Sequence, residues 1–138
     1  MGDIAVEPQT TVGLLDTSIL IAREAGRPLD ETRVPRDVAV SVVTVGELQL
    51  GVLMAQDDIS RSQRLETLGR ALQLGPIPVD GPVASAWALL TQLLKAEGKR
   101  MDINDSWIAA TAIARGWVVV TRDDGFPTTI ACLTVIKA

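Results

Sequence analysis

Apolar residues along the chain alternate between short continuous runs and longer segments with helical spacing. Short apolar runs predict five buried strands, at residues 12–15, 38–40, 76–79, 117–120 and 130–136. Helical spacing predicts helices over residues 18–24, 43–55, 57–74, 82–97 and 103–115. Strands that are apolar throughout and alternate with helices are typical of a parallel sheet with helices on both faces. The pattern predicts one α/β domain over residues 12–138, preceded by a polar extension, residues 1–11.

Two of the predicted helices differ in how their apolar residues are spread. The helix over residues 43–55 is apolar on more than one face, so we expect it either to be fully buried or to contact a partner. The helix over residues 57–74 has one apolar stripe, which we expect to face the core. Its members are Ile59, Leu65, Leu68 and Leu72.

Four acidic residues fall at positions that the predicted topology brings together. Asp16 ends the first strand, and Glu47 lies in the first turns of the helix after the second. Asp105 lies in the first turn of the helix before the fourth strand, and Asp123 follows that strand. Parallel strands all end at the same edge of a sheet, which is where open α/β sheets bind ligands. The four carboxylates are therefore expected at one edge.

Each acid also has an ordinary structural explanation. Asp16 can cap the helix that follows it, and Glu47 ends a T-x-x-E pattern typical of a capping box. Asp105 and Asp102 are both placed to favour the start of a helix, and Asp123 lies in a turn-forming segment. Four like charges at one edge, however, repel one another by about 1 kcal/mol per pair at ~4 Å in water. A divalent cation removes this cost, and hard oxygen ligands suit Mg²⁺ or Mn²⁺.

The composition excludes several kinds of catalysis. The chain has no histidine and no tyrosine, which excludes Ser-His-Asp and Cys-His catalysis, histidine-ligated zinc and a tyrosine nucleophile. Its one cysteine, Cys132, excludes an intramolecular disulfide and is expected to be a small buried hydrophobe. A net charge of −4 disfavours a broad basic surface for nucleic acid. It leaves open a site where bound cations supply the positive charge.

No apolar run is long enough to span a bilayer. The first eleven residues are polar and include Asp3 and Glu7, unlike a signal or transit peptide. We therefore expect a cytoplasmic protein with no membrane partner.

Four motifs in order resemble those of the PIN-domain family, and within it the VapC-type toxins of bacterial toxin–antitoxin pairs. They are L-L-D-T-S at 14–18, S-V-V-T-V-G-E-L-Q-L-G at 41–51, D-S-W-I-A-A-T-A at 105–112 and V-V-T-R-D-D-G-F at 119–126. The resemblance implies a three-layer α/β/α domain whose five-stranded parallel sheet has the order 3-2-1-4-5. It also implies a hydrolase, an endoribonuclease that depends on Mg²⁺ or Mn²⁺ and is neutralised by a VapB-type antitoxin.

The resemblance carries the family's acidic quartet onto particular positions. Its catalytic and metal-binding members are Asp16, Glu47, Asp105 and Asp123, supported by the hydroxyls of Ser18 and Thr121. One departure is Gly125, where many relatives have an acid; Asp124, one residue earlier, is a possible substitute. Asp102, one helical turn before Asp105, is a possible further ligand.

Contacts with RNA and with proteins are also expected. Candidate phosphate contacts are Arg23, Arg100 and Arg122, although exposed arginines are commonly just solvated. We expect a homodimer, and an antitoxin segment laid against the helix over residues 43–55 and the short helix after Asp16. RNA targets are not specified by the sequence, because specificity lies in surface shape and single-stranded loops.

Three alternative functions fit the sequence less well. An aspartyl phosphatase needs a second acid two residues after Asp16, where Ser18 stands, and a lysine that the topology does not place near the site. A signalling receiver domain needs paired acids at the first strand's end and such a lysine. The third alternative is a degenerate PIN-like domain kept for protein binding, against which the intact acidic quartet argues.

Overall fold

The computed structural model describes residues 11–138, so nearly all of the expected N-terminal extension lies outside the described residues. The strands are β1 (Val12–Leu15), β2 (Asp37–Ala39), β3 (Val118–Thr121) and β4 (Val135–Lys137). The helices are α1 (Thr17–Glu24), α2 (Val42–Met54), α3 (Asp58–Gln73), α4 (Gly81–Ala96) and α5 (Ile103–Arg115), with a short 3-10 turn at Glu31–Arg33. Each predicted helix is present, with ends that agree within one residue.

The sheet is parallel throughout and has the order β2-β1-β3-β4. The expected strand at residues 76–79 contributes only a single bridge beside β2, between Ser41 and Ile77. Ile77 donates its N–H to Val40 O (2.9 Å) and accepts from Val42 N (3.0 Å). Because both backbone groups of Ile77 face β2, the flanking Pro76 and Pro78 place their missing N–H groups on the opposite side, which suits a segment at the edge of the sheet. The predicted order 3-2-1-4-5 is confirmed, with its outermost strand reduced to this bridge.

The last predicted strand was too long. Residues 130–133 form a turn instead, closed by a hydrogen bond from Leu133 N to Ile130 O (3.1 Å), and β4 begins only at Val135. Ile130 and Leu133 are nonetheless buried, which explains the continuous apolar run. Cys132, which is free and half-buried, packs against the same part of the core.

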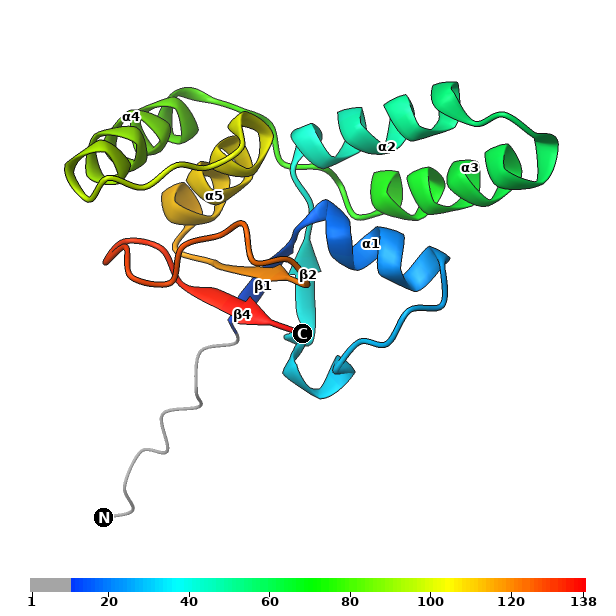
Figure 1. Ribbon diagram of the computed structural model, residues 1–138, viewed down its shortest axis with the longest axis horizontal. Coiled ribbons are helices and arrows are strands. Elements are labelled where there is room, and N and C mark those ends of the chain that lie inside the picture. Colours follow the sequence, from blue (N-terminus) through cyan, green and yellow to red (C-terminus); the bar gives the residue numbers. More distant parts are fainter. Residues whose placement is uncertain (1–10) are drawn as a thin grey trace, which may run out of the picture.

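Helices cover both faces of the sheet, as predicted (Figure 1). Consecutive strand residues point to opposite faces, so Leu14 packs with α4 and α5 while Leu15 packs with α1, α2 and α3. Val119 and Val120 divide in the same way between the two clusters. The three-layer arrangement follows from strands that are apolar on both faces.

The helix pair α2 and α3 projects from the sheet as an arm (Figure 1), and parts of it are exposed. Helix α2 buries Leu48 and Val52 but exposes Leu53 and Met54, so it is not fully buried. The expected stripe on α3 was wrong: Leu68 is buried, but the other three members are exposed. The α3 residues that face α1 and α2 are Thr67, Leu68 and Ala71. Within residues 11–138, none of the helices is long and apolar enough to cross a membrane.

Candidate functional site

A pocket of about 260 Å³ lies at the carboxyl edge of the sheet. The end of β1, the first turns of α1, α2 and α5, and the residues after β3 form its walls. Its lining residues are Asp16, Thr17, Ser18, Ile21, Arg27, Glu47, Asp105, Arg122 and Asp123. The structure therefore brings together all four acids that the topology placed at this edge.

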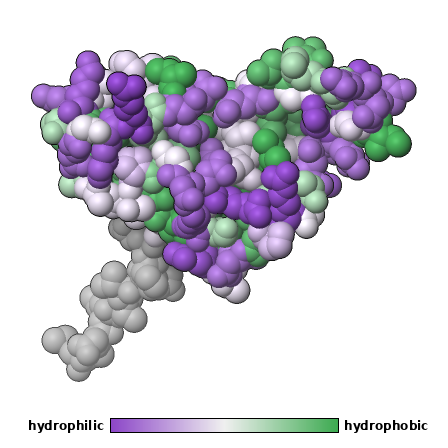
Figure 2. Space-filling model, in the orientation of Figure 1, coloured by the Kyte–Doolittle hydropathy of each residue, from purple (hydrophilic) through white to green (hydrophobic). Residues whose placement is uncertain are grey.

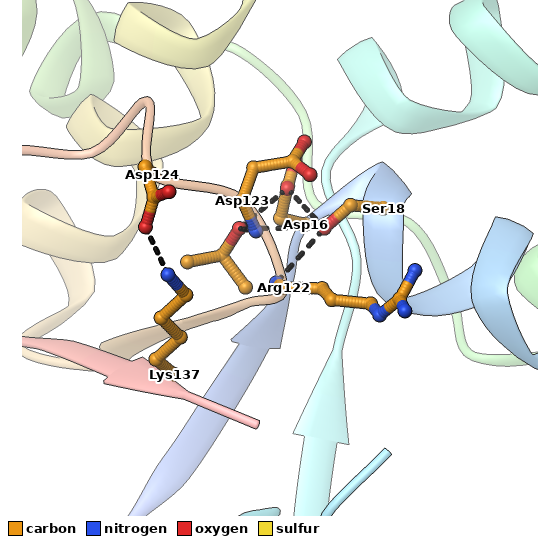
Figure 3. A network of polar contacts seen from close by, with 7 residues as sticks. Asp16, Ser18, Arg122, Asp123, Asp124 and Lys137 are labelled. Carbon is orange, nitrogen blue, oxygen red and sulfur yellow. Dashed lines mark hydrogen bonds and ion pairs between the residues drawn. The ribbon is translucent and has the colours of Figure 1, made fainter. Parts of the chain in front are cut away.

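Asp16 is the most buried of the four acids, with 3% of its surface exposed. It occupies the N-cap position of α1, but its side chain makes no capping hydrogen bond, so the helix-cap explanation is wrong. Its Oδ2 accepts hydrogen bonds from Ser18 Oγ (2.7 Å) and Thr121 Oγ1 (2.9 Å), as Figure 3 shows. The second carboxylate oxygen, Oδ1, receives neither of these bonds and is left for another ligand.

The hydroxyls around Asp16 are themselves tied to the loop after β3. Ser18 Oγ accepts from Arg122 N, and Thr121 Oγ1 accepts from Asp123 N, both at 3.0 Å (Figure 3). Asp16 N also donates to Val120 O at 2.9 Å. These bonds fix the relative positions of Asp16 and the exposed Asp123, which come from segments more than one hundred residues apart.

Glu47 reaches the pocket from the second turn of α2. Ser41 caps this helix by accepting from Val43 N, so the expected capping box is absent. Glu47 Oε1 instead accepts from Thr17 Oγ1 at 2.7 Å. Burial raises the pKa of Glu47, and the nearby charge of Asp16 adds to this, although the hydrogen bond from Thr17 opposes it.

Asp105 has the most perturbed acid–base behaviour in the pocket. Its pKa is raised to about 7, first by burial and then by the charges of the neighbouring acids, which are Asp16, Asp102, Glu47 and Asp123. The carboxylate is close to the loop after β3, because a Cβ built on Gly125 would lie 3.2 Å from Asp105 Oδ2. An acidic side chain at position 125 would meet this carboxylate, which is a physical reason for the glycine.

Two of the possible ligands lie outside the pocket. Asp124 pairs with Lys137 and points away from Asp16 and Asp123 (Figure 3). Asp102 caps α5 by accepting from Asn104 N at 3.0 Å, although its charge still raises the pKa values of Asp105 and Glu47. No lysine lines the acidic pocket, and Lys137, which ends β4, is paired with Asp124.

The cations at the pocket differ from those expected. Arg122 lines it, but Arg23 pairs with Glu31 outside it (2.9 Å), and Arg100 lies in another cleft. Arg27 lines the pocket and was missed. It follows Gly26, whose φ of 65° ends α1 with a turn closed by Arg27 N and Ala22 O at 2.8 Å. A glycine at this position predicts the turn from the sequence, but it does not predict that the Arg27 side chain points into the pocket.

Thr17 was also missed, although it stands between Asp16 and Ser18 in the first motif. Its hydroxyl lies 3.0 Å from Thr44 Oγ1 in addition to its bond to Glu47. Within residues 11–138, no three acidic side chains are arranged to hold a metal ion directly as they lie. The pocket therefore collects negative charge without forming a closed cage.

Comparisons with known proteins agree with this geometry. A family model described as the PIN domain matches residues 13–129. Ribonuclease VapC5 of Mycobacterium tuberculosis is 48% identical over 114 residues, which cover 83% of this chain and 84% of the relative. Ribonuclease VapC4 of the same organism is 44% identical over 113 residues, covering 82% and 87%.

A solved structure is also similar. The crystal structure of VapBC-5 from Mycobacterium tuberculosis, a member of the VapBC family of toxin–antitoxin systems, superposes with a TM-score of 0.85 and 42% identity. The superposition covers 93% of this chain and 99% of that chain. Sequence, fold and the placement of the four acids lead to the same conclusion: this chain belongs to the PIN-domain family.

Proposed function

We propose that this protein is a divalent-metal-dependent endoribonuclease and the toxin of a VapBC-type toxin–antitoxin pair. The observation that carries the proposal is the pocket where Asp16, Glu47, Asp105 and Asp123 meet, with Asp16 held by two hydroxyls rather than by a cation. The names of the relatives, which are ribonucleases, support the choice of reaction.

The donor set fits Mg²⁺ or Mn²⁺. Carboxylate oxygens are the hard ligands that these ions prefer. Burial raises the pKa values of Asp105 and Glu47, and the charges of the neighbouring acids raise them further. Mg²⁺ commonly keeps several waters and takes only one or two carboxylates, so a closed cage is not required. When bound, such an ion lowers the pKa of a water ligand and neutralises charge that develops on the phosphate.

The side chains of the pocket take distinct roles in this proposal. Asp16, Asp105 and Asp123 would hold one or two ions, and Glu47 would complete the site or orient the attacking water. Ser18 and Thr121 keep one oxygen of Asp16 occupied, so that the other is presented to the pocket. The supporting cations, which would hold substrate phosphates, are Arg27 and Arg122.

Partner binding is assigned to the α2–α3 arm. Figure 2 shows hydrophobic patches at the top and the outer end of this arm. Its exposed apolar residues include Leu50, Leu53 and Met54 on α2 and Ile59 on α3, each more than half exposed. A surface of this kind marks a protein contact. We assign it to a homodimer and to a VapB-type antitoxin, and the similarity to VapBC-5, a member of a family of toxin–antitoxin systems, supports an antitoxin as a partner.

The proposal predicts that Asp16→Asn abolishes cleavage. Purified wild-type protein should cleave RNA in millimolar Mg²⁺ or Mn²⁺, and the variant should lose at least about a hundredfold in rate because the amide is a poor metal ligand. The metal should also raise the melting temperature of the wild type by mass action, and raise it less in the variant. The readouts are mapping of new RNA 5′ ends and thermal unfolding.

The matched control is Asp58→Asn, an equally isosteric change at an exposed acid on α3 that is paired only with Arg61. It should cleave like the wild type. Full cleavage by Asp16→Asn would contradict the site. A protein with neither cleavage nor a metal-dependent melting shift would instead be a binding domain.

A further inference from the structure

A second cleft lies between α4, α5 and the loop that joins them. Its volume is about 530 Å³, twice that of the acidic pocket. Its lining residues are Trp87, Thr91, Leu94, Lys95, Gly98, Lys99, Arg100, Met101, Ile103 and Ser106. None of the four pocket acids lines this α4–α5 cleft.

The α4–α5 cleft is basic in a protein of net charge −4. Lys95, Lys99 and Arg100 line it. The acids in this part of the sequence are Glu97, which pairs with Lys99 at 3.2 Å, and Asp102, which caps α5 and does not line the cleft. That pair is exposed and therefore weak. In the described part of the chain, Lys95 and Arg100 form no ion pair. Two cations remain for an anionic ligand.

An oriented aromatic ring lies in the same cleft. Trp87 is half-buried and stacks on Trp107, with ring centroids 4.7 Å apart and planes inclined by 8°. Its Nε1 donates to Ser106 Oγ at 3.0 Å, which fixes the direction of the ring. An oriented tryptophan in a cleft that also holds basic residues is a combination that proteins use to stack a base and hold the phosphates of a single strand.

A path connects the α4–α5 cleft to the acidic pocket. A third cleft of about 550 Å³ shares Asp123 with the acidic pocket and has Lys99 among its other lining residues. Lys99 also lines the α4–α5 cleft, so the two clefts share this side chain. The third cleft adds the cation Arg33, while Lys137, which also lines it, is paired with Asp124. A strand that passes Asp123 therefore meets basic residues on its way to Trp87.

We propose that the α4–α5 cleft binds a single-stranded segment of the RNA substrate, on one side of the phosphate that is cleaved. A base would stack at Trp87, and Lys95 and Arg100 would hold phosphates. This inference rests on the proposed ribonuclease function, but it concerns binding, which is measured without cleavage. An acidic protein segment would fit the charges, but it would make no use of the oriented aromatic ring of Trp87.

Binding is tested with the full-length protein in EDTA and a fluorescein-labelled, mixed-sequence 12-nucleotide single-stranded RNA, followed by fluorescence anisotropy. In the double variant Lys95→Ala/Arg100→Ala the Kd for the RNA should rise about tenfold. The steepness of the plot of log K for RNA binding against log[salt] should fall by ~1.4, because each phosphate contact in a single strand contributes about 0.7. The control double variant, Arg36→Ala/Arg61→Ala, removes two exposed arginines elsewhere and should bind like the wild type.

A second pair of variants tests the tryptophan. Trp87→Leu should weaken RNA binding about tenfold, because base–aromatic stacking contributes roughly 1–3 kcal/mol per base. Trp87→Phe keeps an aromatic face and should stay within about threefold of the wild type, although it loses the bond to Ser106. Thermal unfolding of each variant shows that it is folded before its Kd is compared.

The outcomes separate the two proposals. Loss of cleavage in Asp16→Asn supports the ribonuclease whatever the α4–α5 cleft binds. Unchanged RNA affinity in both Lys95→Ala/Arg100→Ala and Trp87→Leu overturns the α4–α5 cleft as an RNA site. Tighter binding of a glutamate-rich 12-residue peptide than of the RNA, weakened by the Lys95→Ala/Arg100→Ala change, also overturns it and identifies a protein ligand.

Discussion

Asp16 is a buried carboxylate that is oriented by hydroxyls and not neutralised by a cation. Ser18 and Thr121 each donate one hydrogen bond to its Oδ2, and their own oxygens accept from the backbone of the loop after β3. This arrangement keeps the negative charge on Asp16 while fixing its position. A salt bridge would fix the side chain but would also offset the charge that a metal needs.

We therefore expect the hydroxyl of Thr121 to contribute to both stability and cleavage through its hydrogen bonds, and not only by filling space. Thr121→Val keeps the shape of this buried side chain but removes the donor to Asp16 and the acceptor for Asp123 N. We expect a loss of about 1–2 kcal/mol in the free energy of unfolding and at least tenfold slower cleavage, with Thr121→Ser restoring most of both. Urea unfolding and RNA cleavage rates measure the two effects.

Thr111→Val is the matched control, because Thr111 is equally buried but donates only to Trp107 O within α5. It should leave cleavage unchanged. Equal cleavage by Thr121→Val and the wild type would mean that Asp16 does not depend on this hydroxyl.

Asp105 should make the metal-free protein less stable as the pH rises. Its pKa is about 7 when folded, against an ordinary value of 3.8, so the folded state binds more protons between these limits. Stability then falls with rising pH across this range, and the whole penalty is present above pH 7. From pH 5 to 8, we expect wild-type protein in EDTA to lose about 1 kcal/mol more than Asp105→Asn, a reduced figure because solvent screens a half-exposed carboxyl.

Chemical unfolding at several pH values measures this difference. Asp58→Asn, at an exposed acid far from the pocket, should give a curve parallel to the wild type. A parallel curve for Asp105→Asn as well would show that the charges around Asp105 are compensated in the folded protein.

At the scale of elements, close contacts in β1 decide how the sheet and its connections pack. Gly13 lies in β1, and a Cβ built there would lie 2.8 Å from Val120 Cγ2 and 2.9 Å from Pro35 Cγ. Val120 is fully buried in β3, and the side chain of Pro35 is a rigid ring, so neither can easily move away from an added Cβ. The glycine allows the segment before β2 to pass directly over β1, the strand that leads into Asp16.

Gly13→Ala should therefore destabilise the protein by about 1–3 kcal/mol through overpacking. Gly69→Ala, inside α3 with no atom within 4 Å of the added Cβ, should stabilise it by about 0.5–1 kcal/mol, because alanine is the better helix former. Denaturant midpoints compare the two substitutions. A stabilising effect of Gly13→Ala would show that β1 and the segment before β2 separate freely.

At the scale of the whole molecule, the α2–α3 arm predicts self-association. Leu53 and Met54 are 72% and 67% exposed, and burying them in a dimer would remove apolar surface from water. Light scattering should give twice the mass of the chain for the wild type and a larger monomer fraction for Leu53→Asp. Leu89→Asp, at an exposed leucine on α4, is the control and should stay dimeric. A wild type that is monomeric at all concentrations would contradict the dimer.

Two segments that the apolar pattern predicts as strands, residues 76–79 and 130–136, are shorter strands or turns in the structure. Of residues 76–79 only Ile77 pairs with β2, and the prolines on either side of it keep this segment at the sheet edge because they cannot donate to a further strand. Ile130 and Leu133 are apolar because they are buried, and burial does not distinguish a strand from a turn packed on the core.

The sequence by itself determined the alternation of strands and helices and the edge at which four acids meet. Burial on both faces requires continuous apolar strands, and parallel strands share one carboxyl edge. Only the tertiary structure decided that Asp124 pairs with Lys137, that Asp102 caps α5, and that Thr17 holds Glu47. Side-chain partners of this kind depend on rotamers and loop paths set by the packing of the whole domain, which local patterns do not encode.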